Sequence, residues 1–386
     1  MGVGAHWRAA GRPTVTARRA EWRTGSSRRQ ICWERVLRRS YSSLWGASFG
    51  FLFLLGVCFI YLPDPSASPP EEDRVTLLIW NHPFGQYREL PDCWELFQID
   101  RCTLTDDERE YPNADAVIIH HREIATRRVD LPPEPRPRAQ KWIWLNYESP
   151  SHTPRLWLLE GVFNLTMSYR TDSDIFLPYG YLVPRERADT GLQSRFTHQL
   201  RGPSHSDFRR PRLVAWVVSN WSESQARVSL YYELQKFIRI DVFGSAGRTL
   251  AKGCDNVVQL LRRYFFYLAL ENSLHTDYIT EKLWNAVLAG AVPVVLGPPR
   301  KSYERFLPPE AFIHVDDFAT VQELSRYLLM LRNNPARLRR HLDWRGRYSV
   351  HLPVFWGEHF CTACKAVRKS RDRTDGVKDL ALWFHS

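Results

Sequence analysis

The sequence predicts an α/β protein with two doubly wound domains that follow an N-terminal transmembrane anchor. Short apolar runs bounded by turn residues recur along the chain, and such runs are typical of strands buried on both faces of a parallel sheet. In the second half, strand-like runs alternate with runs of helical spacing, which indicates a doubly wound sheet. A charge-free run of nineteen residues near the N-terminus is long enough to cross a bilayer.

The formal net charge of +11 belongs mostly to the N-terminal tail. Residues 1–43 contain ten Arg and only two acids, Glu21 and Glu34, so the tail carries +8 and the other 343 residues carry +3. A nucleic-acid-binding protein gathers its basic residues on a face of the folded domain. The charge distribution therefore argues against nucleic acid as a partner.

Residues 44–62 form the predicted anchor. Arg35, Arg38 and Arg39 flank its N-terminal side, and positive charge at that position indicates that the N-terminus is cytosolic. The alternative is a cleaved signal peptide, but the preceding 43 residues are too many for its charged region and no small-residue cleavage site follows. We therefore predict a cytosolic tail over 1–43, a type II signal anchor over 44–62, and a luminal remainder.

The luminal part begins with a Pro-rich, acidic stem over residues 63–73, which has no core-forming pattern. We predict an N-terminal α/β domain over 74–205, a C-terminal α/β domain over 206–360 and a closing segment over 361–386. A polar stretch near Glu186–Pro211 has no periodicity, and we expect it to link the two domains.

Each domain has its own predicted elements. The first contains three buried strands, at Val75–Trp80, Ala114–His121 and Lys141–Ser149. The second contains strands at 212–221, 239–244, 265–272 and 291–297, and helices at 224–238, 257–264, 277–290, 321–334 and 336–345.

Polar residues gather at one edge of the second domain. Glu271 and Asn272 close one predicted strand, and Glu281 and Lys282 open the next helix. Ligands of open α/β sheets bind outside the carboxyl ends of the strands, and anions favour helix N-termini. We expect Lys282 to neutralise a phosphate and Glu281 to hydrogen-bond ribose or sugar hydroxyls. The alternative is a solvated ion pair, but the apolar residues that follow already form the core stripe of this helix, so the pair projects elsewhere.

Two more residues suit a transfer reaction. Arg227 lies in the first turns of the helix after VVSNW, where a second cation would help to hold a diphosphate. The alternative is an ordinary surface arginine. Glu148 ends a predicted strand just before a Pro-bounded turn, where a carboxylate can face an inter-domain cleft and act as a general base. No G-x-G-x-x-G or Walker sequence is present, which argues against a standard dinucleotide or ATP site.

Three motifs are not predicted to bind a metal. His120 and His121 are neighbours on a strand, so their side chains point to opposite faces. Asp172 and Asp174 match a D-x-D pattern that holds a divalent metal and a diphosphate in many transferases, but we favour a capped turn. The motif CTAC (Cys361–Cys364) has no second C-x-x-C or nearby His pair, so disulfide bonding is a better interpretation than zinc.

These segments together resemble the Lewis-type α1,3-fucosyltransferases. The matching motifs are HHRE (His120–Glu123), WIWLNYESPSHTP (Trp142–Pro154), FNLTMSYRTDSDIFLPYG (Phe163–Gly180), VAWVVSNW (Val214–Trp221), DVFG (Asp241–Gly244), LENSLHTDYITEKLWNAVLAGAVPVVLGP (Leu270–Pro298) and FLPPEAFIHVDDF (Phe306–Phe318). The likeness extends over nearly everything from Val75 to the C-terminus. It implies a type II Golgi membrane enzyme with the GT-B arrangement, in which two Rossmann-like domains face a cleft.

The reaction that the resemblance implies is transfer of L-fucose from GDP-fucose to the 3-hydroxyl of GlcNAc, with inversion at the fucose anomeric carbon. Glu148 matches the family's catalytic base. The residues that match its donor site are Arg227, Asn272, Tyr278, Glu281 and Lys282, with Arg227 and Lys282 as the phosphate-binding cations. No obligate metal is expected, because the GT-B arrangement uses cationic side chains where D-x-D enzymes use a metal.

The acceptor is expected to be a glycan on a glycoprotein or glycolipid. By resemblance, His121, Arg122 and Glu123 are the acceptor contacts. Arg at the Arg122 position looks like the family members that act on type 2 chains (Galβ1,4GlcNAc), so the expected product is Lewis x. Sialylated acceptors, which would give sialyl Lewis x, stay open.

One departure from the family pattern favours a different class of protein. The family usually has Lys or Arg in Y-K-F-Y-L-x-F-E-N, whereas this chain has Phe265 there and Leu270 in place of the second Phe. If the missing cation contributes to GDP binding, donor affinity falls unless Arg262 or Arg263 compensates. The alternative function is a membrane-anchored, lectin-like binding protein that keeps the fold without turnover.

A luminal location also predicts two covalent modifications. Asn164 and Asn220 lie in glycosylation sequons. A glycan on Asn220 would obstruct the donor cleft, so we expect modification of Asn164 and not of Asn220.

The luminal cysteines are Cys93, Cys102, Cys254, Cys361 and Cys364. We expect the cross-pairing Cys93–Cys361 and Cys102–Cys364, which ties the two ends of the luminal part together. The alternative is local pairing, Cys93–Cys102 and Cys361–Cys364, but the C-x-x-C loop is tight.

Overall fold

The computed structural model describes residues 74–185, 196–249 and 255–386, which all belong to one compact unit. The predicted tail, anchor and stem, and Cys254, lie outside the described residues. No helix within the described residues is long and apolar enough to cross a membrane.

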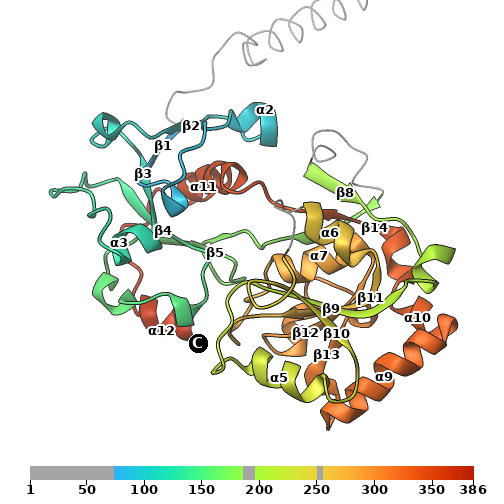
Figure 1. Cartoon of the computed structure of the whole chain (residues 1–386). Helices are drawn as coiled ribbons and strands as arrows, with labels where there is room; N and C mark the ends of the chain where they lie inside the picture. The colour runs from blue at the N-terminus through green and yellow to red at the C-terminus, as the bar shows by residue number, and fades with distance from the viewer. Residues whose placement is uncertain (1–73, 186–195, 250–254) are drawn as a thin grey trace, which may run out of the picture. The chain divides into compact units, whose positions relative to one another are not determined.

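The first sheet has six parallel strands in the order β2-β1-β3-β4-β5-β6 (Figure 1). Its strands are β1 (Val75–Ile79), β2 (Cys102–Thr105), β3 (Ala116–His120), β4 (Lys141–Asn146), β5 (Leu165–Ser168) and β6 (Ile175–Phe176). Every residue of β3 and β4 is buried, which explains why their sequences are continuous apolar runs and not alternating ones.

The second sheet has five parallel strands in the order β10-β9-β11-β12-β13. They are β9 (Arg212–Val218), β10 (Ile240–Gly244), β11 (Tyr264–Leu270), β12 (Val292–Leu296) and β13 (Ile313–His314). In both sheets, the first strand lies between the second and the third, so the direction of winding reverses beside it. The prediction of two doubly wound parallel sheets is confirmed, and each sheet has one topological switch point where ligands bind in such folds.

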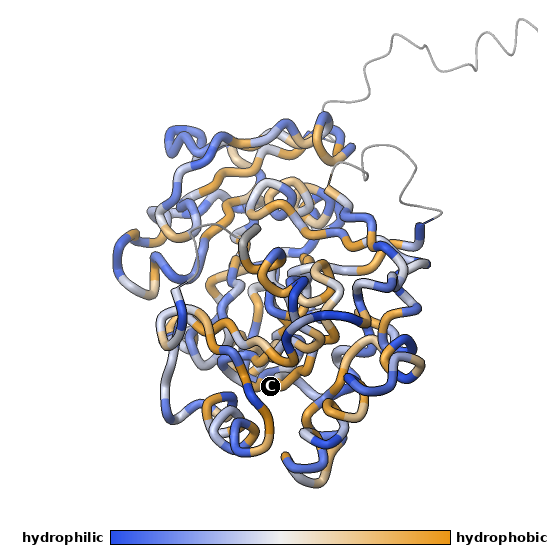
Figure 2. The backbone as a smooth tube through the Cα atoms, turned by 45° about the vertical axis from the view of Figure 1, so that its right-hand side comes forward, coloured by the Kyte–Doolittle hydropathy of each residue, from blue (hydrophilic) through white to orange (hydrophobic). Residues whose placement is uncertain are grey.

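The helices pack around these sheets. They are α2 (Cys93–Phe97), α3 (His121–Ala125), α5 (Ala226–Leu234), α6 (Asp255–Leu261), α7 (Glu281–Ala289), α8 (Arg300–Tyr303), α9 (Val321–Asn333), α10 (Pro335–Arg340), α11 (Gly357–Lys369) and α12 (Leu380–His385). Figure 2 shows orange, hydrophobic stretches running through the middle of the described chain and blue, hydrophilic stretches mostly at its periphery.

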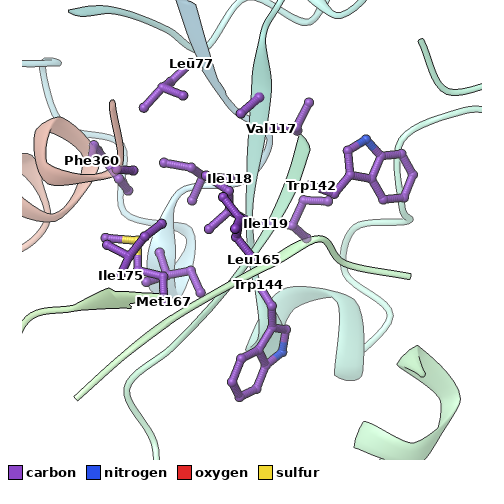
Figure 3. Close-up of a cluster of buried hydrophobic side chains, with 14 of the residues drawn as sticks. Leu77, Val117, Ile118, Ile119, Trp142, Trp144, Leu165, Met167, Ile175 and Phe360 are labelled. Atoms are coloured by element: carbon purple, nitrogen blue, oxygen red, sulfur yellow. The ribbon is translucent and has the colours of Figure 1, made fainter. Parts of the chain in front are cut away.

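The chain returns to the first sheet at its C-terminal end. In α11, Phe360, Ala363, Cys364 and Val367 follow the i, i+3, i+4, i+7 spacing of one helix face, and all four are buried. They belong to the apolar cluster of the first sheet, part of which Figure 3 shows with Phe360 labelled. The segment 361–386 is therefore part of the core of the first sheet.

Disulfides hold this return in place. Cys93 is bonded to Cys361 and Cys102 to Cys364, so both bridges connect α11 to the region of α2 and β2. This is the cross-pairing and not the local one.

A third, antiparallel sheet has the order β7-β14-β8. Its strands are β7 (Tyr181–Pro184), β8 (Thr197–Gln199) and β14 (Tyr348–His351). This sheet was not predicted, because β8 lies in the polar stretch expected to be an aperiodic link. The short strands β2, β5 and β6 also escaped prediction, since periodicity is weak over two to four residues that include polar ones.

Some predicted helices are shorter in the structure. The helix expected over 277–290 begins only at Glu281, and the one expected over 336–345 ends as α10 at Arg340 and is followed by a 3₁₀ turn at Asp343–Arg347. Thr280, in extended backbone, is the N-cap of α7.

The buried position of Phe360 generates a stability prediction. Replacing Phe360 with Ala removes a core side chain, so the free energy of unfolding of the full chain is expected to fall by about 3–5 kcal/mol in urea denaturation. Leu382→Ala, at a site that is 72% exposed, is the control and is expected to change it by less than about 0.5 kcal/mol. Equal effects of the two substitutions would show that α11 is not part of the core.

Candidate active site

A cavity of about 550 Å³ lies at the switch point of the second sheet, where β9 and β11 end. We call it the donor cavity, because the donor-binding residues predicted from the sequence are expected at this edge. Its polar lining comes from these strand ends and from the first turns of α5 and α7: Ser219, Asn220, Arg227, Asn272, Glu281, Lys282 and Asn285. Four of the five residues predicted to bind the donor thus share one cavity.

The first turn of α7 presents two charged residues beside a buried stripe. Leu283, Trp284 and Val287 are buried and fix which face of the helix packs on the sheet. The Glu281 side chain is 61% exposed, whereas that of Lys282 is 16% exposed. The two neighbours are therefore not a solvated surface pair, because the ammonium lies within the protein wall.

Lys282 is held by a buried carboxylate that follows β11. Its Nζ lies 2.9 Å from Glu271 Oε2, 2.7 Å from Thr280 Oγ1 and 3.3 Å from Glu281 Oε1. The Glu271 carboxylate also accepts hydrogen bonds from the Thr280 backbone N–H and hydroxyl. The end of β11 and the start of α7 are thereby locked together.

The Lys282 side chain stays protonated. Burial lowers the pKa of this ammonium, but the carboxylates of Glu271 and Glu281 outweigh burial and raise the pKa above its ordinary value. The cavity wall therefore contains a permanent positive charge at a helix N-terminus, which suits an anionic group.

Arg227 supplies a second cation from α5. The residue is 3% exposed, its Nε donates to Gln225 Oε1 at 2.8 Å, and its guanidinium also donates to the Asn220 carbonyl. Burial lowers the pKa of Arg227, but a guanidinium stays protonated at neutral pH. Its orientation is set by the loop after β9, which lines the same cavity.

Glu148 follows β4 and is half-buried. The Asn146 side chain contacts its backbone on both sides, accepting from the Glu148 N–H and donating to the Glu148 carbonyl, each at 3.3 Å. The Tyr179 hydroxyl, on the wall of the donor cavity, donates to the carbonyl of Tyr147 at 2.6 Å. These bonds fix the backbone of Glu148 beside a residue of the cavity wall.

Hydrogen bonds between side chains, which the sequence did not predict, join the loops after the strand ends of the two sheets. Ser273 Oγ donates to Ser149 Oγ at 2.6 Å, and Ser151 Oγ lies 2.7 Å from His275 Nε2. Ser149 directly follows Glu148, and Ser273 directly follows Asn272. The predicted base and the donor cavity are therefore connected through the loops that carry them. The signal in the sequence for such contacts is a Ser that follows a strand end in both ESPSH and ENSLH.

The family comparison agrees with this arrangement. Residues 72–180 match the model "Fucosyltransferase, N-terminal", and residues 208–383 match "Glycosyltransferase family 10 (fucosyltransferase) C-term". The chain belongs to glycosyltransferase family 10, the fucosyltransferases. The first match contains the strands of the first sheet, and the second match contains the strands of the second sheet.

Individual relatives are similar over most of their length. Alpha-(1,3)-fucosyltransferase 4 of Mus musculus is 42% identical over 98% of this chain and 94% of its own. The corresponding Homo sapiens protein is 41% identical over 99% of this chain and 76% of its own. Alpha-(1,3)-fucosyltransferase 7 of Bos taurus is 45% identical over 83% of this chain and 90% of its own.

A solved structure shares the fold. The crystal structure of an alpha1,3-fucosyltransferase with GDP-fucose has a TM-score of 0.50 and 18% identity, covering 80% of this chain and 93% of that chain. The similarity supports the two-sheet, GT-B arrangement of this fucosyltransferase.

Tyr278, a predicted donor contact, and Phe265, which replaces a cation of the family pattern, do not line the donor cavity. Tyr278 is 4% exposed and packs on Tyr169 with ring centroids 5.2 Å apart. Phe265, the departure from the family pattern, is 5% exposed and belongs to an apolar cluster with Trp216 and Val228. Phe265 is therefore a core residue of the second sheet, and it leaves the cations of the cavity unchanged.

His121 and Glu123, two of the predicted acceptor contacts, are buried, and His121 lines a separate cavity of about 250 Å³. Their contact with the acceptor stays a prediction. His121 is 2% exposed, accepts a hydrogen bond from Trp144 Nε1 at 3.1 Å and lies with Nε2 3.0 Å from the Pro154 carbonyl. Glu123 is 3% exposed and is paired with His120. Arg122 is exposed, and its guanidinium lies 4.9 Å from the centre of the Phe84 ring. Of the three predicted acceptor contacts, Arg122 is the one at the surface.

Both aspartates of the D-x-D motif accept hydrogen bonds from other side chains or backbone groups of the chain. Asp172 accepts from the Arg170 guanidinium and from Trp383 Nε1 at 3.0 Å, and Asp174 accepts from the Thr166 N–H at 2.8 Å. These bonds connect the end of β5 to α12 and to the turn before β6. No cluster of three or more His, Cys, Asp or Glu side chains suited to a metal occurs among the described residues.

We predicted modification of Asn164 and not of Asn220, but Asn164 is buried and Asn220 is exposed. Asn164 is 3% exposed, and its amide donates to the carbonyls of Thr374 at 3.2 Å and Asp375 at 3.4 Å. A glycan there requires the amide to leave these partners, and the modification of Asn164 stays a prediction. Asn220 is exposed at the donor cavity, where a glycan would share space with the donor.

The buried His121 makes stability depend on pH. Burial lowers the pKa of His121 from its ordinary value of 6.5 to about 4, so the unfolded chain takes up a proton below pH 6.5 that the folded chain does not. Stability from this residue is present above pH 6.5 and is lost as the pH falls toward 4. The free energy of unfolding is expected to drop by about 2 kcal/mol between pH 7 and pH 5 on account of His121.

Urea denaturation of wild type and His121→Gln at both pH values measures this term, because glutamine does not titrate. The drop between pH 7 and pH 5 is expected to be smaller in the variant by about 2 kcal/mol. His205→Gln, at an exposed histidine, is the matched control for loss of an imidazole. An identical drop in wild type and His121→Gln would contradict the assignment.

Proposed function

We propose that this fucosyltransferase transfers L-fucose from GDP-fucose, in α1,3 linkage and with inversion, to GlcNAc of N-acetyllactosamine-type glycans, which gives Lewis x structures. The observation that carries the proposal is the donor cavity, where Lys282 and Arg227 lie at the start of two helices and the loop carrying Glu148 is hydrogen-bonded to the adjacent strand end. The α1,3 linkage agrees with the printed names of the relatives.

The donor side of the reaction needs neutralisation of charge. As the bond between the fucose anomeric carbon and the diphosphate oxygen breaks, negative charge grows on GDP. Lys282, kept protonated by Glu271 and Glu281, and Arg227 stabilise that charge as fixed cations. Glu281 is exposed in the same cavity and is the residue we assign to hydroxyls of the donor sugar or ribose. We assign Asn272 to the donor as a further polar contact.

The acceptor side needs a base. In a single displacement, the 3-hydroxyl oxygen of GlcNAc forms a bond to the fucose anomeric carbon, its proton passes to Glu148, and GDP leaves with the bonding electron pair. Within the described chain, the Glu148 carboxylate has no hydrogen-bond donor of its own, so it is available to accept that proton.

The cellular setting follows from the same proposal. A type II signal anchor would place the catalytic part in the Golgi lumen, where glycans of glycoproteins and glycolipids are the acceptors. Arg122, exposed over Phe84, is the acceptor-side residue that we assign to type 2 chain recognition.

A lectin-like protein without turnover is the second candidate. Its support was Phe265, which is buried in the core and does not touch the donor cavity. The catalytic proposal is therefore favoured, and the activity assay below separates the two.

Replacing Glu148 with Gln tests the base. Gln keeps the size of the side chain but cannot take the proton, so kcat for fucose transfer to N-acetyllactosamine is expected to fall by about 10²–10⁴-fold. Binding of the donor and the melting temperature are expected to stay near wild type. Glu108→Gln, at an exposed acid of the same domain, is the control and is expected to keep full activity. Wild-type protein that binds the acceptor without forming product would instead support the lectin-like function.

Chelation tests the assignment of charge neutralisation to side chains. Because Asp172 and Asp174 are engaged with Arg170 and Thr166, we expect the initial rate to be the same with and without EDTA. The measurement is fucose transfer by full-length protein after dialysis against EDTA, with re-addition of Mg²⁺ or Mn²⁺ as the control. Loss of activity that either ion restores would contradict side-chain neutralisation.

A further inference from the structure

Residues 352–356 lie between β14 and α11, and we call them the connecting segment. They carry the chain from the third sheet back to the first. Phe355 lines both the donor cavity and a cavity of about 540 Å³ at the first sheet. Leu352 and Pro353 line the donor cavity, and Trp356 lines the other one. A displacement of the connecting segment would therefore change the walls of both cavities.

A buried histidine and a buried carboxylate stand at the two ends of the connecting segment. His351, the last residue of β14, is 4% exposed, and Glu358, in the first turn of α11, is 9% exposed. His351 Nε2 lies 2.9 Å from Oε1 and 3.0 Å from Oε2 of Glu358. Because an ionised carboxylate only accepts hydrogen bonds, Nε2 carries the proton and donates it. The pair closes the connecting segment into a loop.

The Glu358 carboxylate also holds the middle of this loop. The Val354 N–H donates to Glu358 Oε2 at 3.1 Å, and the Glu358 N–H donates to the Val354 carbonyl at 3.0 Å. On the other side, His351 pairs with Tyr181 of β7 in the antiparallel ladder, and their rings lie 4.8 Å apart. The third sheet is therefore the frame against which Glu358 fixes the connecting segment.

The connecting segment in turn fixes the residue before the proposed base. Tyr147 is 3% exposed, and its ring packs edge-on against the rings of Phe355 and Trp356, with centroids 5.5 and 5.4 Å away. The ring of His359, in α11, lies 4.7 Å from the Tyr147 ring. Glu148 directly follows Tyr147, so the place of its backbone depends on where these rings lie.

We propose that Glu358 is a positioning residue of the transfer reaction. Its contacts with His351 and Val354 hold the connecting segment, and through Tyr147 they keep Glu148 aligned with a donor in the donor cavity. Glu358 lines neither cavity, so it acts without touching a substrate. The inference rests on the proposed function and adds the residue that aligns its base.

The test is fucose transfer by full-length protein in detergent, with GDP-fucose and N-acetyllactosamine both saturating. Each rate is divided by the concentration of GDP-binding sites, which a GDP titration measures. Glu358→Ala is expected to lower kcat by about 10- to 100-fold, because a small misplacement of a reacting group has effects of this size. The Kd for GDP is expected to stay within about threefold of wild type, because Lys282 and Arg227 are held by contacts outside the connecting segment.

Two further substitutions separate the contacts of Glu358. Glu358→Gln keeps an oxygen that accepts from the Val354 N–H, so kcat is expected to recover to within about threefold of wild type. His351→Ala keeps the bond between Glu358 and Val354 and is expected to lower kcat less than Glu358→Ala does. The double variant His351→Ala/Glu358→Ala is expected to match Glu358→Ala, because groups that act as a unit are not lost twice.

Asp207→Ala is the matched control for loss of a buried, paired carboxylate. The Asp207 side chain is 12% exposed, against 11% for that of Glu358, and it lies 2.6 Å from Arg210. Asp207 lines neither cavity and does not contact the connecting segment. Its loss is expected to lower the melting temperature and to keep the wild-type kcat per GDP-binding site.

An unchanged kcat in Glu358→Ala, or an equal loss in Asp207→Ala, overturns the inference and leaves the proposed function intact. A rise in the Kd for GDP as large as the fall in kcat overturns it too. If Glu358→Ala binds no GDP, His351→Ala decides, and an unchanged kcat in that variant overturns the inference. Wild-type protein that transfers no fucose overturns the proposed function and the inference together.

Discussion

The buried ion pair between Glu271 and Lys282 is the interaction on which the donor site depends. A carboxylate that is 2% exposed at the end of a central strand needs a partner, since an unpaired buried charge costs several kcal/mol. Lys282 and the Thr280 N–H and hydroxyl provide it, and this fixes where α7 begins. The same pairing holds the Lys282 ammonium at the cavity wall, so one set of contacts fixes the start of α7 and positions the cation that the proposed reaction requires.

The first sheet is organised by a different constraint. Its core is completed by α11 and α12, which follow the second sheet in the chain and are tied back by two disulfides. Arg170 and Asp172 strengthen this return through contacts with Trp383 and the backbone of Phe384. The two domains are therefore not consecutive pieces of chain, because the last part of the chain completes the core of the first sheet.

The contacts between the strand ends explain how two separate sheets form one site. Ser149 and Ser151 meet Ser273 and His275, and Thr171 donates to Asp277 at 2.7 Å. Each is a short polar side chain in a loop, and such loops carry binding residues because a rigid scaffold positions them. Phe355 lines the cavity at each sheet, so the two cavities adjoin at this residue.

The sequence by itself determined the local chemistry of this protein. Apolar runs identified the central strands, and the positions of Arg227, Glu281 and Lys282 beside strand ends identified the donor cavity, because parallel strands place their carboxyl ends at one edge. Long motifs identified the family. Only the tertiary structure decided which residues are buried. His121 and Glu123 are buried, and Phe265 lies in the core of the second sheet. Of the two sequon asparagines, Asn164 is buried and Asn220 is exposed. Whether a residue is buried depends on which distant segments pack over it, as α11 packs over the first sheet. The hydrophobic pattern of a short strand does not show which segments those are.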